Sequence, residues 1–436
     1  MGNLEIGLLG FLVLVILLVI RMPVGTAMLL VGTGGLYILS PRGALPTLAG
    51  EVFSISSVYS LTILPLFVLM GNLAGVSGMS RDLYDAAQSW FGHFRGGLAS
   101  STVVGCAGFS ALSGSSLASA VTMGRVALPE MQRRNYADSL ATGSIAAGGT
   151  LGILIPPSAG FVVYAILTEE SIGRLFMAGV LPGLMLTGLF ILGITILVRR
   201  NPELAPASPH RESLQLRMRS LGRASWIISI ILITIGGIYL GVFSAVEAAG
   251  IGAFLAFLVA LFRGTLTWAA CKEVIAYTTR STATTFIILM GAFVFTPFVA
   301  RTGIPAAIVD GLVSLGLGPY GVLLLILAVL IILGTFLEGF AILVLTLPLI
   351  QPIMETYGFD LVWFGVLMVI VLEMGLISPP VGINVFVVKG IAPGVSMNTI
   401  FRGIWPFWFA MLIAILILVA VPEIALLLPN TMFGGG

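Results

Sequence analysis

The 436-residue sequence contains few charged residues. Only 9% are Asp, Glu, Lys or Arg, whereas a soluble domain averages about 25%. So few charges cannot cover a water-facing surface, and the hydrophobic share of 58% indicates a chain solvated mainly by lipid or by its own apolar residues. Two histidines and two cysteines argue against a histidine-based metal or catalytic site and against a disulfide framework. The net charge of +2 gives no reason to expect nucleic acid or another polyanion as a partner.

Eight apolar stretches are long enough, at about 17–25 residues, to cross a bilayer as helices. They are residues 4–20, 22–40, 52–75, 176–198, 225–243, 246–262, 281–300 and 404–428. The first stretch carries Glu5 in place of a basic n-region and has no small-residue cleavage site, so we expect it to remain as a span. The predicted fold class is an all-α polytopic membrane protein.

Glycine and proline, by contrast, are abundant: 54 glycines and 22 prolines are more than a bundle of plain spanning helices needs. Four further apolar segments are interrupted by such residues: 97–131, 136–167, 320–354 and 360–391. The predicted breaks are, in chain order, Ser113-Gly114-Ser115-Ser116; Gly148-Gly149-Thr150 with Pro156-Pro157; Glu338-Gly339; and Gly375 with Ser378-Pro379-Pro380. In lipid, backbone groups freed at such breaks are tolerated only where protein or a wet cavity satisfies them. The breaks are therefore candidate functional elements.

The positions of Lys and Arg predict the orientation. Suppose that the first and third interrupted segments turn back as re-entrant hairpins, while the second and fourth cross the membrane. Seventeen of the twenty Lys and Arg residues then lie on one side, and only Arg42, Arg174 and Arg301 lie on the other. The basic side is expected to be cytoplasmic, which places both termini outside. Residues 80–94 form an amphipathic pattern typical of an interfacial helix, and the proline- and arginine-rich residues 201–223 predict a solvated cytoplasmic loop.

The two halves of the sequence resemble each other. Four pairs of residues recur 225 positions apart: Gly25 with Gly250, Gly78 with Gly303, Leu112 with Leu337, and Gly114 with Gly339. At a separation of 223, the segment Gly152 to Pro157 aligns with Gly375 to Pro380, each ending in Pro-Pro. Because the orientation above runs the paired segments in opposite directions, this is an inverted repeat. Inverted repeats with matched broken helices are typical of secondary transporters whose site lies between the halves.

The breaks offer two kinds of ligand. Helix N-termini present free N–H groups that suit a carboxylate, and helix C-termini present carbonyl oxygens that suit a small hard cation, here sodium. The predicted sodium ligands of the first repeat are Ser113, Gly114, Ser115, Gly149, Thr150 and Gly152. Those of the second repeat are Gly334, Thr335, Glu338, Gly339, Gly375, Ser378 and Gly382. The predicted solute contacts are Ser115, Ser116, Ser158, Ser378 and Asn384.

Glu338 and Glu373 are costly at membrane depth, so each is either a functional group or a helix cap. If one of them carries protons, the coupling ion is H⁺ rather than Na⁺. An intramembrane enzyme with Ser113 or Ser115 as nucleophile is a further alternative, but it lacks a base because neither histidine lies in an apolar run. A purely structural or receptor protein would have no reason to keep two acids and four broken segments at depth.

Four strings of this sequence resemble a known family. GFSALSGSSLASAVTMGRVALPEM, GGTLGILIPPS, GTFLEGFAILVLTLPLIQPIM and LEMGLISPPVGINVF are similar to the hairpins and broken helices of the large membrane subunit of tripartite ATP-independent periplasmic (TRAP) transporters. The resemblance covers essentially the whole chain. The related dicarboxylate/sodium symporters carry Ser-Asn-Thr at their hairpin tips, whereas the tips here read Ser-Gly-Ser and Glu-Gly-Phe, which favours the tripartite family over a stand-alone symporter.

The resemblance implies an ion-transporter-superfamily fold in which a transport domain moves against a scaffold like an elevator. It implies scaffold helices at 1–50 and 171–275 (with the cytoplasmic loop 199–224), transport-domain halves at 51–170 and 276–400, and a C-terminal helix at 401–436. It further implies sodium-coupled uptake of a small organic acid, with two or more Na⁺, across a bacterial cytoplasmic membrane. The implied partners are a periplasmic substrate-binding protein and a small four-helix membrane subunit, which we expect to be a separate chain because no four spans precede Leu4. A C4-dicarboxylate, a sialic acid and a sugar acid all remain open as the solute.

Overall fold

Helices make up the fold, as the apolar spans predict. The computed structural model describes residues 2–206 and 211–432, so parts of the predicted cytoplasmic loop (207–210) and of the C-terminal segment (433–436) lie outside the described residues. Within the described ranges there are twenty α-helices, two short 3₁₀ helices and no strand. The helices are α1 (Asn3–Val19), α2 (Val24–Leu39), α3 (Pro41–Ser57), η1 (Tyr59–Thr62), α4 (Ile63–Val76), α5 (Met79–Phe91), α6 (Gly97–Ser113), α7 (Ser116–Arg133), α8 (Asp138–Leu154), α9 (Ala159–Thr168), α10 (Ile172–Arg200), η2 (Pro202–Leu204), α11 (Leu214–Tyr239), α12 (Ala245–Phe262), α13 (Trp268–Thr302), α14 (Ile304–Ser314), α15 (Pro319–Gly334), α16 (Gly339–Thr356), α17 (Leu361–Leu376), α18 (Ile383–Ile391), α19 (Met397–Ala420) and α20 (Glu423–Met432).

Eight helical stretches in the described ranges are at least 18 residues long and apolar enough to cross a membrane. The chain is therefore a multi-pass membrane protein, and the predicted all-α fold class is confirmed. Five predicted spans correspond to single helices, namely α1, α2, α10, α11 and α12.

The predicted span 52–75 is wrong at its start, because two helices meet inside it. The helix α3 ends at Ser57, and η1 leads into α4 from Tyr59. Between them Val58 is extended (φ −67°, ψ 111°). The Ser57 hydroxyl donates to the Phe53 carbonyl at 2.8 Å, a local bond that competes with continuation of the helix.

Two other predicted spans have different bounds. The span 404–428 is split into α19 and α20, because Pro422 disfavours the helical conformation of the residue before it and Val421 is extended (φ −134°, ψ 75°). The span 281–300 is only the later part of α13, since Thr267 caps that helix by accepting from the Ala270 amide at 3.2 Å. The residues from Trp268 to Arg280 and the predicted span 281–300 are thus one continuous helix.

The cytoplasmic connectors also differ in part from the prediction. The amphipathic segment 80–94 is confirmed as the helix α5, which ends at Phe91. The predicted loop 201–223 is too long, because α11 already begins at Leu214, where Ser213 accepts from the Leu216 amide at 3.3 Å. The described part of the loop ends at Ser213.

Two helical hairpins have their turns where the sequence predicts them. The helices α6 and α7 are joined by Gly114 and Ser115, and Gly114 has a φ of +58° that residues other than glycine adopt only at a cost. The helices α15 and α16 are joined by residues 335–338. The tight connections make both pairs antiparallel.

Two broken helices follow the hairpins, and their breaks lie at the Pro-Pro pairs. The helix α8 ends at Leu154 and α9 begins at Ala159, while α17 ends at Leu376 and α18 begins at Ile383. Both Pro-Pro peptide bonds are cis.

The predicted breaks at Gly148-Gly149-Thr150 and at Gly375 are wrong, because α8 and α17 continue through them. A Cβ on Gly148 would lie 2.8 Å from the Cys106 sulfur, and one on Gly149 would lie 2.7 Å from the Ala120 Cβ. These glycines allow close helix packing and do not end a helix.

The inverted repeat is matched by the order of the helices. Gly78 and Gly303 have φ values of +79° and +74° and precede α5 and α14, which are therefore equivalent. The pairing of Gly114 with Gly339 is wrong by two positions: α7 begins at 116 and α16 at 339, a separation of 223 rather than 225. Gly114 precedes its helix, whereas Gly339 is the first residue of one.

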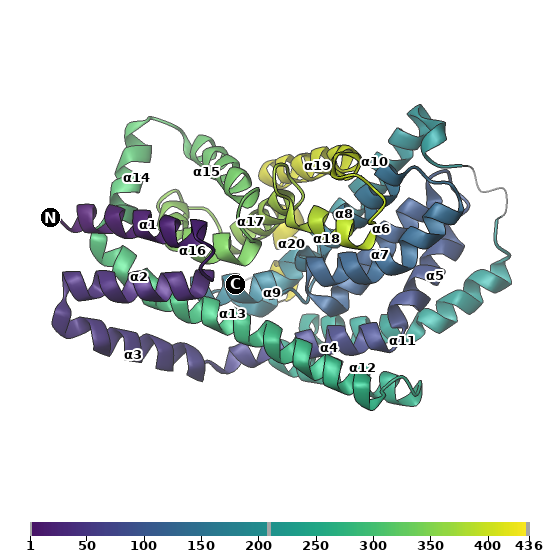
Figure 1. Cartoon of the computed structure of the whole chain (residues 1–436), viewed down its shortest axis with the longest axis horizontal. Coiled ribbons are helices and arrows are strands. Elements are labelled where there is room, and N and C mark those ends of the chain that lie inside the picture. The colour runs from purple at the N-terminus through teal and green to yellow at the C-terminus, as the bar shows by residue number, and fades with distance from the viewer. Residues whose placement is uncertain (1, 207–210, 433–436) are drawn as a thin grey trace.

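Figure 1 shows α2, α3 and α13 lying along one edge of the molecule, with α4 and α12 continuing that edge. Helices of the two repeats pack against each other along this edge: α2 of the first repeat packs on α13 of the second, and α12 of the second packs on α4 of the first. The N-terminus lies at one end of the view, and α5 and the start of α11 lie at the other.

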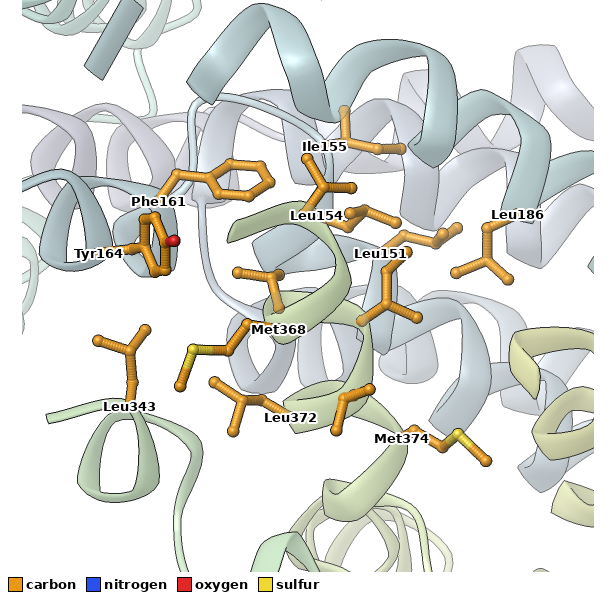
Figure 2. Close-up of a cluster of buried hydrophobic side chains, with 14 of the residues drawn as sticks. Leu151, Leu154, Ile155, Phe161, Tyr164, Leu186, Leu343, Met368, Leu372 and Met374 are labelled. Carbon is orange, nitrogen blue, oxygen red and sulfur yellow. The ribbon is translucent and has the colours of Figure 1, made fainter. Parts of the chain in front are cut away.

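The centre of the molecule is a hydrophobic cluster shared by the two broken helices (Figure 2). Leu151, Leu154 and Phe161 of the first repeat face Met368 and Leu372 of α17. The cluster packs both broken helices into one body, because close van der Waals contact is what holds helices together in a membrane.

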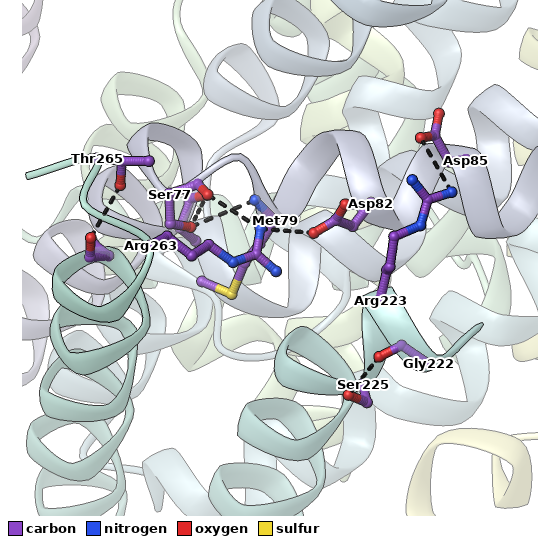
Figure 3. Close-up of polar contacts among 11 residues, drawn as sticks. Ser77, Met79, Asp82, Asp85, Gly222, Arg223, Ser225, Arg263 and Thr265 are labelled. Atoms are coloured by element: carbon purple, nitrogen blue, oxygen red, sulfur yellow. Dashed lines mark hydrogen bonds and ion pairs between the residues drawn. The ribbon is translucent and has the colours of Figure 1, made fainter. Parts of the chain in front are cut away.

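The helix α5 is held to α11 and α12 by ion pairs (Figure 3). Arg263 lies 2.6 Å from Asp82 and also donates to the Ser77 carbonyl at 3.2 Å, while Arg223 lies 3.8 Å from Asp85. Partial burial raises the pKa of Asp85 from its usual value, and the nearby Arg223 opposes that rise. The connector before the first hairpin is thus fixed at its scaffold side mainly by Arg263.

Candidate functional site

The first hairpin tip is held by contacts between the hairpin and the adjacent break. The Ser113 and Ser119 hydroxyls are 2.8 Å apart, and the Gly114 carbonyl accepts from the Ala159 amide at 3.4 Å. Ser115 caps α7 by accepting from the Ala118 amide at 3.4 Å. The tip of the hairpin therefore rests directly on the first break.

Glycines bring α8 against this tip. A Cβ on Gly152 would lie 2.5 Å from the Ser115 carbonyl oxygen, and one on Gly149 would lie 3.1 Å from that of Ser116. The predicted residues of the first repeat thus come together, with two exceptions in side-chain direction. Thr150 donates within its own helix to the Ala147 carbonyl at 2.6 Å, and Ser158 caps α9 by accepting from the Phe161 amide at 3.2 Å.

The second hairpin tip is less enclosed. Gly334 packs directly on Gly375, where an added Cβ would lie 2.9 Å from the neighbouring Cα. Thr335 donates to the Ile332 carbonyl at 2.8 Å within its own hairpin. Glu338 occupies the N-cap position of α16, but no side-chain cap hydrogen bond forms. Its carboxylate does lie near the Phe340 and Ala341 backbone amides of that helix, so capping and a functional role both stay predictions for this acid.

At the second break, the Ser378 side chain has hydrogen-bond partners, whereas the Asn384 side chain has none among the described residues. The Ser378 hydroxyl donates to the Met374 carbonyl at 2.6 Å and accepts from the Trp408 indole at 2.9 Å, and Gly382 lies beside it. Asn384 is fully buried, and neither its Oδ1 nor its Nδ2 has a partner among the described residues. A buried, unpaired amide needs a partner such as a ligand or a water.

Glu373 connects the two repeats. Its carboxylate, on α17, lies next to the Ser116 hydroxyl at the start of α7. The residue is 1% exposed, and its Oε2 has no hydrogen-bond partner among the described residues. A void of about 10 Å³, bordered by Gly160, Gly339 and Glu373, is close to the smallest volume that holds a water.

A cavity of about 370 Å³ lies beside the first tip, between α4 and α13 on one side and α6 and α7 on the other. Ser113 and Ser115 line it, whereas Ser116, Ser158, Ser378 and Asn384 do not. A second cavity of about 290 Å³ shares Asn72, Thr122 and Glu273 with the first. The cavities extend toward the helix ends that carry the basic connectors.

Sequence reasoning missed several residues of this cavity: Asn72, Thr122, Arg125, Glu273 and Tyr277. Asn72 donates to Thr278 at 3.0 Å, which joins α4 to α13. Part of the set could have been found, because Ser115, Ala118, Thr122 and Arg125 recur at spacings of three and four and share one face of α7. Glu273 and Tyr277 could not, since they come from a helix 150 residues further on in the sequence.

The chain matches the family model described as "Tripartite ATP-independent periplasmic transporter, DctM component" over residues 11–424. It belongs to this family. The C4-dicarboxylate TRAP transporter large permease protein DctM of Pseudomonas aeruginosa is 38% identical over 385 residues, 88% of this chain and 89% of that protein. The sialic acid TRAP transporter large permease protein SiaM of Vibrio cholerae is 32% identical over 422 residues, 96% of this chain and 97% of that protein.

The fold of this TRAP large permease is similar to that of a solved transporter. The crystal structure of the YdaH transporter of Alcanivorax borkumensis superposes with a TM-score of 0.64, and the match covers 87% of this chain and 88% of that one. Sequence identity is 17%, so this likeness concerns the fold alone.

The TRAP permease places two different chemistries at its two breaks. The first tip presents hydroxyls to an open cavity that is also lined by Arg125, further along α7, and by Glu273, so the hydroxyls and the arginine suit an anion. The second break buries Glu373 and the unpaired Asn384 amide, which suits a small cation or a proton. Ser113 and Ser115 are bonded to a hydroxyl and a backbone amide, so the described residues give neither serine a base for nucleophilic catalysis.

Proposed function

We propose that this chain is the large permease of a sodium-coupled uptake system for a small organic acid. The cavity beside Ser113 and Ser115 carries the proposal, because its volume suits a small solute and its hydroxyls and Arg125 suit a carboxylate, while Glu273 is the one acid in its lining. The relatives named for C4-dicarboxylates and sialic acid support this class, since both solutes carry carboxylates.

Two sodium ions would bind at the pseudo-symmetric breaks. At the first, the Ser113 and Ser115 oxygens and the carbonyls near Gly114, Gly149 and Gly152 lie close together. At the second, the Asn384 amide oxygen, which has no partner among the described residues, lies at the start of α18, just after the connection that holds Ser378 and Gly382. Hydroxyl, amide and carbonyl oxygens are the ligands that hard cations prefer. Sodium binding would order both tips before the solute enters.

The transport step we propose is an elevator movement of the hairpins and broken helices against a scaffold. In this proposal α4 and α13 belong to the scaffold, unlike in the domain bounds above, which place residues 51–170 and 276–400 in the transport domain. Two features support the movement: the cavity lies between these two helices and the first hairpin, and the broken helices share one hydrophobic core. Glycines allow the helices on the two sides of the proposed movement to approach closely, as at Gly71, where a Cβ would lie 2.7 Å from the Ser113 Cα.

The proposed assembly includes a periplasmic binding protein and a separate small four-helix membrane subunit on the scaffold, in a bacterial cytoplasmic membrane. Both chain termini would then be periplasmic, as the distribution of Lys and Arg favours.

The test is solute uptake by the reconstituted complex with its binding protein outside the liposomes. An inward sodium gradient should drive accumulation of succinate or N-acetylneuraminate, and replacement of sodium by choline should abolish it. Accumulation that continues without sodium would contradict sodium coupling.

Proton coupling is the second candidate, because the Glu373 carboxylate is buried with an unpaired oxygen. Uptake is measured at fixed sodium while the pH is varied, in wild type and in Glu373→Gln. Proton coupling predicts a pH dependence that disappears in the variant. Sodium coupling predicts that the pH profile is unchanged while the sodium concentration for half-maximal uptake rises.

A further inference from the structure

The cavity at the first hairpin tip has two charged lining residues, and their charges are opposite. Arg125 lies on α7, about two and a half turns beyond Ser115, and Glu273 lies near the start of α13. Both side chains are exposed to the open space of the cavity. Its remaining lining is uncharged.

Among the described residues, neither Arg125 nor Glu273 has an ion-pair partner. The ion pairs among the described residues are Arg133–Glu130, Arg223–Asp85 and Arg263–Asp82. A free arginine and a free carboxylate facing one cavity are each available to a charged solute.

The two residues belong to parts of the molecule that the proposed movement separates. Arg125 lies on the hairpin that carries the solute, whereas Glu273 lies on α13, which packs against α2 and α4. When the hairpin moves away from the basic side, Arg125 travels with it and Glu273 does not. The distance between the two charges therefore depends on the transport state.

We propose that Arg125 guides the carboxylate of the solute through this cavity and that Glu273 promotes its release on the basic side. This proposal rests on the proposed function. Arg125 offers five donors in a planar fork that matches a carboxylate. Glu273 competes with the solute for that fork and repels the solute's own negative charge, so affinity is lowered only while the cavity is open to the basic side.

This arrangement favours release of the solute on the basic side without changing the solute contacts at the tip. Ser113 and Ser115 move with the hairpin and hold the solute in both states, whereas Glu273 acts in one state only. A residue that weakens binding in one of two states lowers affinity there by its differential interaction energy. Glu273 is in this sense a positioning residue that acts through Arg125 and through the electric field of the cavity.

The experiment uses the complete complex in liposomes, with the binding protein outside and radiolabelled succinate or N-acetylneuraminate, whichever wild type accumulates. Initial uptake is measured while the same unlabelled solute is loaded inside at increasing concentration. The variants are Glu273→Gln and Arg125→Gln. Matched controls are Glu203→Gln and Arg133→Gln, which change charges on the same basic side but outside the cavity.

Glu273→Gln should be inhibited by internal solute at concentrations about threefold to tenfold lower than wild type, as expected when one repelling charge at cavity range is removed. The external concentration for half-maximal uptake should stay unchanged in this variant. Arg125→Gln should lower the maximal uptake rate and require more internal solute for inhibition. Both controls should follow wild type.

The exchanged double variant Arg125→Glu with Glu273→Arg separates this role from a structural ion pair. A pair that only supports the fold would be restored by the exchange, whereas the proposal predicts uptake below that of either single variant, because the carrying hairpin then repels the solute. Unchanged internal inhibition in Glu273→Gln, or recovery in the exchanged variant, overturns the proposal. Wild type that accumulates neither solute under a sodium gradient contradicts the proposed function itself and this inference with it.

Discussion

The two hairpin tips occupy corresponding places in the repeat but differ in turn length and in surroundings. At the first tip, the Gly114 carbonyl accepts a hydrogen bond from the Ala159 amide at the adjacent break. Ser113 and Ser115 face a cavity of about 370 Å³. At the second tip, Phe336 is 61% exposed and Glu338 has no cap bond. The difference teaches that the repeat determines where the chain breaks, whereas the packing of α4 and α13 beside the first hairpin determines which break meets an open cavity.

The charges follow the same division. The cavity beside the first tip has an exposed arginine, Arg125, and an exposed acid, Glu273, while the second break buries Glu373 and the Asn384 amide. The first break is thus suited to an anionic solute and the second to a cation. This contrast can be tested by substitutions in each of the two tips.

The largest expected effect is that of an alanine at the first tip. Gly114→Ala should reduce uptake at least tenfold and destabilise the protein, because a left-handed alanine costs about 1–2 kcal/mol and its Cβ would lie 2.8 Å from the Pro157 carbonyl oxygen. Gly339→Ala is the matched control, since its Cβ would meet nothing closer than 3.9 Å. Uptake and thermal unfolding of the purified variants check this. Equal losses in both variants would refute the contrast.

The sequence alone predicted much of this contrast. Gly, Ser and Pro break helices through local chemistry, so the tip at Ser113–Ser116 and the breaks at both Pro-Pro pairs could be located, whereas the second tip, predicted at Glu338-Gly339, spans residues 335–338. The region Gly148–Thr150 could not be interpreted correctly, because the same residue type also allows close packing, and the Cys106 and Ala120 side chains that decide between these roles are distant in the sequence.

The candidate site was less predictable than the fold. The serines at the first tip face the cavity, but the charges that distinguish this tip come partly from α13, which only the tertiary fold brings near. The partners of Ser378 show the same limit, since its hydroxyl is engaged by Trp408 of α19. Which of the predicted ligands bind sodium stays a prediction.

The next effect is that of removing one hydroxyl. Ser115→Ala should raise the solute concentration for half-maximal uptake by about tenfold to a hundredfold, because a hydrogen bond to a charged group contributes about 1.5–3 kcal/mol. Thr335→Ala should change it less than about twofold, since that hydroxyl is bonded within its own hairpin. Uptake kinetics of both variants check this, and a larger effect of Thr335→Ala would reverse the assignment of the two tips.

A smaller effect is expected in the helices that lead to the two tips. Arg263→Gln removes the contacts to Asp82 and Ser77 shown in Figure 3 and should lower the melting temperature by a few degrees. Asp310→Asn, in the equivalent helix α14, should not change it, because no ion pair involving Asp310 is found among the described residues. A loss of stability in Asp310→Asn would show that side-chain contacts of an acid stabilise α14 as well as α5.

The smallest effect concerns Asp85. Burial raises the pKa of this carboxyl above its unfolded value, so folding favours the protonated form, and that contribution is present at low pH and lost as the pH rises through the folded-state pKa. Asp85→Asn should therefore raise the melting temperature slightly at neutral pH, and the gain should vanish in acid. A melting temperature that falls at neutral pH would show that the pair with Arg223 outweighs burial.

Protection of the two tips by solute tests the central claim most directly. Ser115→Cys and Thr335→Cys are prepared in a chain with Cys271 replaced by serine, and Cys106 is retained because it is buried. Both variants are labelled with a membrane-impermeant thiol reagent from the basic side, with and without the transported solute in sodium. The account predicts that solute slows labelling of the cysteine at 115 and leaves that at 335 unchanged. Protection at 335 without protection at 115 would contradict it.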